Sequence, residues 1–100
     1  MVALSKKYIL SYLQQHKQEL AEKYAISRIG LFGSFATQSE SKESDIDLVY
    51  DTNSKGLTFK ELIMLEEQLT TAFNKKIDLV NINFMNPLIK RKAMQDIIYV

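Results

Sequence analysis

The segment Gly33–Val49, GSFATQSESKESDIDLV, joins a Gly-Ser pair to a polar run and to two aspartates that flank Ile46. The polar run predicts a surface loop, and the apolar residues at 45–51 predict a strand. Because side chains alternate between the faces of a strand, Asp45 and Asp47 lie on one face, about 6.6 Å apart along the strand. Two carboxylates on one face repel each other and are costly to desolvate unless a cation lies between them. The segment therefore predicts a cation site.

The tetrapeptide IDLV occurs twice, at 46–49 and at 77–80, so Asp78 has the same local context as Asp47. If the two strands are neighbours, three carboxylates converge on one spot. Mg²⁺ is the natural candidate, because it prefers hard oxygen ligands and is often held by carboxylates together with substrate phosphates. A pair of ions binds both the attacking and the leaving oxygen in phosphoryl-type transfer. Asp45, Asp47 and Asp78 are thus the candidate metal ligands and catalytic residues.

Gly33 and Ser34 are candidates for holding a phosphate group. A glycine allows close approach of the backbone, and N–H groups at the start of a helix favour anions. Ser34 adds a hydroxyl donor and is also a candidate cap for a short helix after Gly33.

Size and composition indicate one ordinary globular domain, residues 1–100. The chain is 46% apolar and 25% charged with a formal net charge of +1, which disfavours disorder and nucleic-acid binding by bulk charge. It has no cysteine, so a disulfide scaffold or a thiolate metal site is excluded. We expect a cytoplasmic chain without a membrane span, because no apolar run approaches roughly 18 residues and the N-terminus does not resemble a signal peptide.

Periodicity and capping signals predict the order α-β-(α)-β-α-β-α-β, hence an α+β fold with a mixed four-stranded sheet and helices mainly on one face. Thr58 and Glu61 form a capping box at the start of one helix, and Asn74 is a plausible left-handed stop at its end. The predicted elements are helix 5–24, strand 26–32, a short helix after Gly33, loop 38–44, strand 45–51, turn 52–56, helix 58–73, strand 75–82, a helix of about ten residues from Pro87, and strand 97–100.

The motifs GLFGSFA, SDIDLVYD and KKIDLV together resemble those of the DNA polymerase β superfamily of nucleotidyltransferases. The resemblance covers essentially the whole chain and is strongest to the minimal nucleotidyltransferases, which consist of the catalytic palm alone. It implies that Gly33 and Ser34 bind the triphosphate of ATP, that Asp45 and Asp47 bind Mg²⁺, and that Asp78 is the third carboxylate.

The resemblance also implies a partner. Minimal nucleotidyltransferases are typically paired with an all-helical HEPN protein, often a ribonuclease toxin, and act as type VII antitoxins by transferring AMP to a tyrosine. We therefore expect a hetero-oligomer with a HEPN-type protein, or a homodimer when the chain is alone, and no direct nucleic-acid partner.

One departure from the family keeps other functions open. Many members continue Gly-Ser-x-Ala with Arg-Gly, where this chain has Thr37 and Gln38. Lys42 is the candidate substitute for the missing phosphate-binding cation. Without that arginine the chain could be an antitoxin that only binds its partner. A transferase for a small molecule such as an aminoglycoside is disfavoured, because a hundred residues leave no second domain for the acceptor. The basic run at 90–92 is a solvated helix face or a dock for an acidic partner.

Overall fold

The computed structural model describes residues 4–53 and 56–100. Its elements in chain order are α1 (Lys6–Tyr24), β1 (Ile26–Phe32), α2 (Gly33–Thr37), β2 (Ile46–Thr52), α3 (Phe59–Phe73), β3 (Ile77–Asn81), the 3₁₀ turn η1 (Ile82–Phe84), α4 (Pro87–Ala93) and β4 (Ile98–Tyr99).

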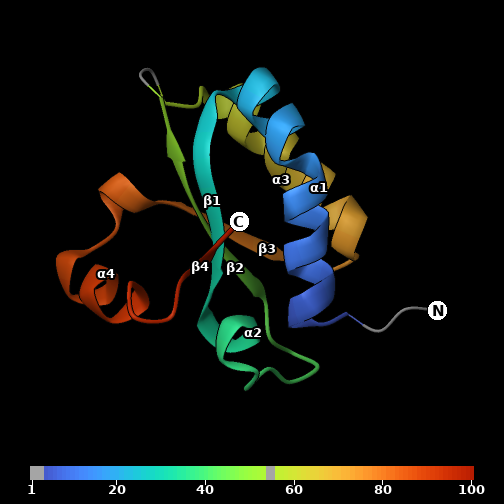
Figure 1. Cartoon of the computed structure of the whole chain (residues 1–100), viewed down its shortest axis with the longest axis vertical. Coiled ribbons are helices and arrows are strands. Elements are labelled where there is room, and N and C mark those ends of the chain that lie inside the picture. Colours follow the sequence, from blue (N-terminus) through green and yellow to red (C-terminus); the bar gives the residue numbers. More distant parts are fainter. Residues whose placement is uncertain (1–3, 54–55) are drawn as a thin grey trace.

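The four strands form one mixed sheet in the order β3-β2-β1-β4. β1 runs antiparallel to both β2 and β4, whereas β2 and β3 run parallel. A parallel pair needs a crossover connection, and α3 supplies it. Figure 1 shows α1 and α3 together on one side of the sheet and α4 on the other. This confirms the predicted α+β fold with a mixed four-stranded sheet.

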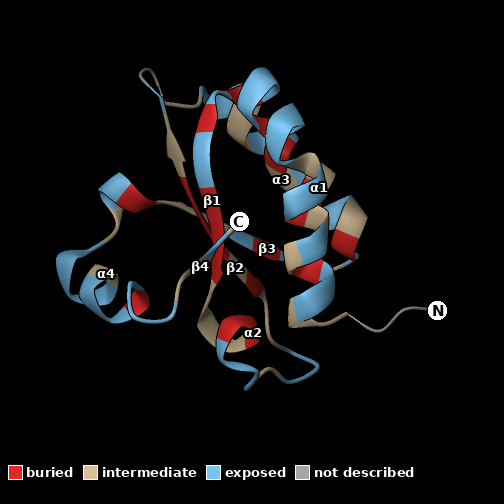
Figure 2. Ribbon diagram, in the orientation of Figure 1, coloured by how far each residue is buried: buried red, intermediate tan, exposed pale blue. Residues whose placement is uncertain are grey.

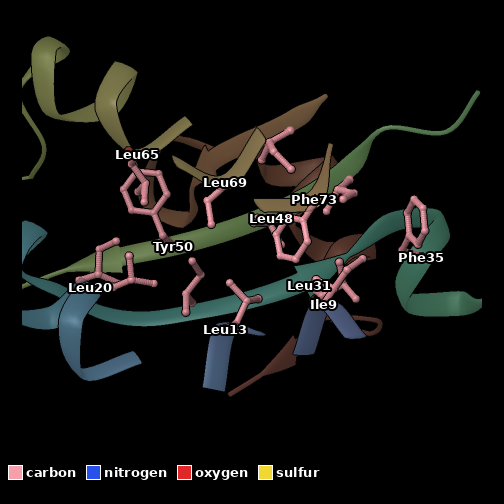
Figure 3. Packing of buried hydrophobic residues seen from close by; sticks show 14 of the residues in the cluster. Ile9, Leu13, Leu20, Leu31, Phe35, Leu48, Tyr50, Leu65, Leu69 and Phe73 are labelled. Atoms are coloured by element: carbon pink, nitrogen blue, oxygen red, sulfur yellow. The ribbon is translucent and has the colours of Figure 1, made fainter. Parts of the chain in front are cut away.

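The main core lies between the sheet and the two long helices. α1 and α3 place their apolar stripes on one sheet face, and Figure 3 shows these side chains meeting those of β1 and β2. Alternation along β2 assigns Leu48 and Tyr50 to this core, so Asp47 and Val49 belong to the opposite face. Figure 2 shows the buried residues concentrated where the helices meet the sheet. The fully buried large side chains are Ile9, Leu13, Leu20, Ile29, Leu31, Ile46, Leu48, Val49, Leu65 and Leu69.

The ends of the long helices follow the predicted capping signals. The Ser5 hydroxyl accepts a hydrogen bond from the Tyr8 amide at the start of α1. Thr58 and Glu61 form the reciprocal capping box of α3, and Asn74 ends this helix in a left-handed conformation. These confirmed signals are local, because each needs only a few adjacent residues.

Several predicted boundaries were wrong. Ser34 is not the cap of α2, because the helix already begins at Gly33 and Phe32 occupies the cap position. β3 begins at Ile77 rather than residue 75. It ends at Asn81 rather than residue 82, since the Asn81 side chain accepts a hydrogen bond from the Asn83 amide and turns the chain into η1. α4 has seven residues rather than about ten, and β4 only two.

Smaller shifts affect β2 and the turn that follows it. β2 begins at Ile46 rather than Asp45, and Thr52 belongs to this strand rather than to the predicted turn 52–56. Residues 54 and 55 of that turn lie outside the described residues. Within the described part of the chain, no helix is long and apolar enough to cross a membrane.

Candidate active site

Gly33 and Asp47 are in direct contact at the end of the β1–β2 pair. Asp47 lies opposite Phe32 in the antiparallel register, so the chain leaves β1 beside the Asp47 carboxylate. Gly33 has a φ of +74°, and a Cβ placed there would overlap the carboxylate oxygen Oδ2 and lie 2.9 Å from Cγ. Glycine is therefore required at this position both by the backbone conformation and by the neighbouring carboxylate.

Asp78 lies beside Asp47 on the neighbouring strand. The two IDLV segments pair in parallel and in register, so that Asp47 is the direct partner of Asp78. Paired residues in adjacent strands project from the same face of a sheet. The two strands are thus neighbours, which was the condition set for the carboxylates to converge, and both carboxylates belong to the face opposite the main core.

Asp45 lies one residue before β2 and is partly exposed. Its Oδ2 is 3.8 Å from the Nζ of Lys76, with which it forms an ion pair. The backbone continues the β2–β3 ladder at this point, because the Ile46 amide donates to the Lys76 carbonyl. Asp45 therefore stands at the same end of the sheet as Asp47 and Asp78.

The three carboxylates influence one another electrostatically. The pKa of Asp47 is raised by burial and, to a smaller extent, by the negative charges of Asp78 and Asp45. Burial and the neighbouring negative charges thus destabilise the ionised form of Asp47, and a bound cation would offset this destabilisation.

The side chains are less convergent than the sequence predicts. Among residues 4–53 and 56–100, no three His, Cys, Asp or Glu side chains are close enough together to hold a metal ion. The aspartates share a sheet face and one end of it, and their oxygens are the ligand type that Mg²⁺ prefers. The residues therefore fit a magnesium site in chemistry and backbone placement, while their side chains stand apart.

Ser34 and Lys42, the two other predicted site residues, lie on either side of the polar loop. Ser34 is the second residue of α2, next to Gly33, and its carbonyl accepts hydrogen bonds from the Thr37 hydroxyl and the Ser39 amide. Lys42 is exposed, and its carbonyl accepts a hydrogen bond of 2.8 Å from the Nζ of Lys75. Ser34 thus adjoins Asp47 through Gly33, whereas Lys42 is tied by its backbone to the turn before β3.

Sequence reasoning missed Lys75 and Lys76, which bind the loop and Asp45 respectively. The signal was present in the motif KKIDLV, whose two lysines directly precede the second IDLV. Extending the in-register pairing of the two IDLV segments by one residue places Lys76 beside Asp45.

Comparison with known proteins places this architecture in a family. The family model described as polymerase beta, nucleotidyltransferase, matches residues 14–100. A candidate protein adenylyltransferase of Methanocaldococcus jannaschii is 37% identical over 93 residues, covering 92% of this chain and 94% of the relative. The protein adenylyltransferase MntA of Thermococcus cleftensis is 31% identical over 100 residues, which is the full length of both chains.

Solved structures share the fold at low sequence identity. A candidate minimal nucleotidyltransferase superposes with a TM-score of 0.79 at 18% identity, over 98% of both chains. A toxin–antitoxin crystal structure with AMP-PNP gives a TM-score of 0.70 at 20% identity, over 96% of this chain and 72% of that one. An MNT antitoxin in complex with a tri-AMPylated Shewanella oneidensis HEPN toxin gives a TM-score of 0.68 at 17% identity, over 94% of this chain and 70% of that one.

The family model covers most of the chain, and full-length relatives exceed 30% identity. The chain therefore belongs to the polymerase β nucleotidyltransferases, in the minimal branch that contains protein adenylyltransferases of the MntA type.

Proposed function

We propose that this enzyme transfers AMP from ATP, in a Mg²⁺-dependent reaction, to a tyrosine hydroxyl of a HEPN-type partner, and that it acts as the antitoxin of that partner. The observation that carries the proposal is Asp47, packed against Gly33 and paired in register with Asp78. The related structure with AMP-PNP supports ATP as the proposed substrate, and the related structure with an AMPylated HEPN toxin supports a HEPN-type protein as the proposed partner. With ATP as substrate, we expect the reaction in the cytoplasm.

Each proposed site residue has a role that follows from its position. Gly33 lets the backbone approach the triphosphate, and the adjacent Ser34 hydroxyl donates to a phosphate oxygen. Asp45, Asp47 and Asp78 would hold Mg²⁺, which when bound offsets the negative charge of the triphosphate. Asp78 is exposed, so it is also accessible to the acceptor hydroxyl and can orient it or take its proton.

The bond changes of the proposed transfer balance as follows. The tyrosine oxygen forms a bond to the α-phosphorus of ATP, and the bond from this phosphorus to the bridging oxygen breaks. The proton leaves the tyrosine hydroxyl, and pyrophosphate is released. Residues 1–100 act as a single catalytic domain, and the partner supplies the tyrosine.

Thr37 and Gln38 favour a second function, an antitoxin that only binds its partner. Neither side chain carries a charge, whereas an arginine at position 37 would supply a bidentate phosphate contact. We place this function second, because all three aspartates remain at the site.

AMP transfer to a HEPN-type partner protein tests the proposal. ATP labelled at the α-phosphate is incubated with both proteins and Mg²⁺, and the modified residue is mapped by mass spectrometry. We expect a tyrosine-linked AMP that disappears with Asp47→Asn and with EDTA. A complex that forms without any labelled product would instead establish the binding-only antitoxin.

A further inference from the structure

The segment from η1 to α4 carries an unusual concentration of exposed apolar side chains. Phe84 is 85% exposed, Leu88 80%, Met94 61% and Ile89 58%. Side chains of this size are normally covered, and a group of them on a surface marks an interaction site. We call Phe84, Leu88, Ile89 and Met94 the α4 platform.

The α4 platform is on the same side of the sheet as the candidate active site. Figure 1 shows α4 on the side away from α1 and α3, and Asp47 and Asp78 belong to that same face. Val49, two residues beyond Asp47 on this face, is fully buried, and Ile82 of η1 and Ala93 of α4 are also buried. None of the three belongs to the main core cluster. The η1–α4 segment is thus anchored on the face that carries the aspartates.

The platform is bordered by positive charge. Lys90, Arg91 and Lys92 lie in α4, and none of them forms an ion pair within the described residues. A surface of apolar anchors beside unpaired cations is complementary to an apolar surface edged by carboxylates.

A second copy of the chain fits this platform poorly. A two-fold interface would place the basic α4 of one copy against the basic α4 of the other, so like charges would repel. The acidic residues Glu66 and Glu67 lie on α3, across the sheet from α4 in Figure 1. Pairing α4 with α3 of another copy would be head-to-tail, and contacts of that kind continue into an open chain rather than a closed dimer unless the rotation closes a ring.

We propose that the α4 platform is the docking surface for the acceptor protein, through an apolar patch on that protein edged by Asp or Glu side chains. This inference rests on the proposed function, because it identifies how the acceptor is held beside Asp47 and Asp78.

The test uses the full chain and the purified HEPN-type partner, with binding measured by calorimetry. Leu88→Glu should weaken the complex by at least about 30-fold, because it introduces a charge at an apolar anchor. Arg91→Glu should weaken it by about tenfold, and the complex of the wild type should weaken as salt is raised. Phe59→Glu is the matched control, since Phe59 is 78% exposed and is the first residue of α3, the helix on the other side of the sheet from α4 in Figure 1. The affinity of this variant should stay within about twofold of the wild type.

Thermal melts and ATP binding separate docking from folding and from catalysis. Leu88 is exposed, so Leu88→Glu should melt like the wild type and bind ATP and Mg²⁺ unchanged. Wild-type affinity in both α4 variants, or AMP transfer by Leu88→Glu at the wild-type KM for the partner, would overturn the docking surface and leave the proposed function standing. Partner binding that depends on α4 without any AMP transfer would instead support the docking surface and overturn the proposed function. Self-association of the chain alone that is abolished by Leu88→Glu would assign the platform to a second copy and also overturn the proposal.

Discussion

Gly33 is the residue at which the requirements of the fold and of the site coincide. Replacing it with alanine should cost about 1–2 kcal/mol for the left-handed backbone, and more because the new Cβ would displace the Asp47 carboxylate. Urea unfolding and ATP calorimetry measure the two effects, and we expect Gly33→Ala to lose both stability and nucleotide affinity.

Gly56 provides the matched control for this prediction. Its φ is +68°, but a Cβ there would meet no atom within 4 Å. Gly56→Ala should therefore show the backbone cost alone and bind ATP normally. Equal losses of unfolding free energy and equal ATP affinities in the two variants would show that the contact between Gly33 and Asp47 has no consequence.

Asp47→Asn should raise the melting temperature of the metal-free protein at pH 7. The pKa of Asp47 is raised by burial and by the charges of Asp78 and Asp45, so its ionised form destabilises the folded state above that pKa. As the pH falls through the raised pKa towards the ordinary value of 3.8, the wild type becomes protonated and the advantage of the amide should shrink. A melt in which this variant collapses would make Asp47 a structural residue.

Asp51→Asn, on the same strand, serves as the control, because we expect it to change the melting temperature in the opposite direction. Burial acts to raise its pKa, but hydrogen bonds from Asn83, Arg28 and the Thr52 amide outweigh this and lower it. Ionised Asp51 therefore stabilises the fold above its ordinary pKa, and this contribution is lost as the pH falls through the lowered pKa. Asp51→Asn should melt below the wild type at pH 7 and approach it in acid.

Among the elements, α2 shows where the chain departs from its family. This five-residue helix ends at Thr37, and its cap residue Gln38 has a φ of +60°. Gln38 stands where the Gly-Ser-x-Ala-Arg-Gly motif that the chain resembles would have glycine. Because a side chain is strained in this conformation, Gln38→Gly should stabilise the fold by about 0.5–1 kcal/mol in urea unfolding. Ala25→Gly, at the left-handed end of α1 with a φ of +55°, should behave alike. A lower unfolding free energy for Gln38→Gly would mean that the glutamine side chain contributes an interaction of its own.

Thr37 is the α2 residue at the position of the family's arginine. Its hydroxyl lies 3.3 Å from the carbonyl oxygens of Gly33 and Ser34. Because Thr37 is exposed, a longer side chain at this position would extend into solvent rather than into the core. A charged hydrogen bond contributes about 1.5–3 kcal/mol, so Thr37→Arg should tighten ATP binding by roughly one to two orders of magnitude. Thr37→Gln is the uncharged control. If neither variant changes the affinity measured by calorimetry, Lys42 or Lys75 already supplies the cation.

The elements that the sequence predicted well are those with local signals at their ends. The capping box of Thr58 and Glu61 marks the start of α3, and Asn74 marks its end. The boundaries predicted wrongly depend on contacts that no local pattern reveals. β3 stops where the Asn81 side chain turns the chain, and β4 is short because it pairs with β1 only at Gly30 and Leu31.

For the whole molecule, the repeated IDLV made the sheet predictable around the site. Register pairing of the two copies places Asp47 beside Asp78, as the repeat indicated. Side-chain convergence was not predictable in the same way, because mutual repulsion acts on the rotamers and leaves no sequence pattern. The ion pair between Lys76 and Asp45 was likewise not predictable from a local pattern, since it arises only once β2 and β3 lie side by side.

Calorimetric titration of the chain with ATP, with and without Mg²⁺, tests most directly whether the three aspartates form a metal-dependent nucleotide site. The wild type should bind ATP weakly but measurably with Mg²⁺, and much more weakly in EDTA. Asp47→Asn should abolish the effect of the metal, whereas Asp51→Asn, altered four residues along the same strand, should retain it. Equal ATP affinity with and without Mg²⁺ in the wild type, or an unchanged metal effect in Asp47→Asn, would contradict the assignment of the site.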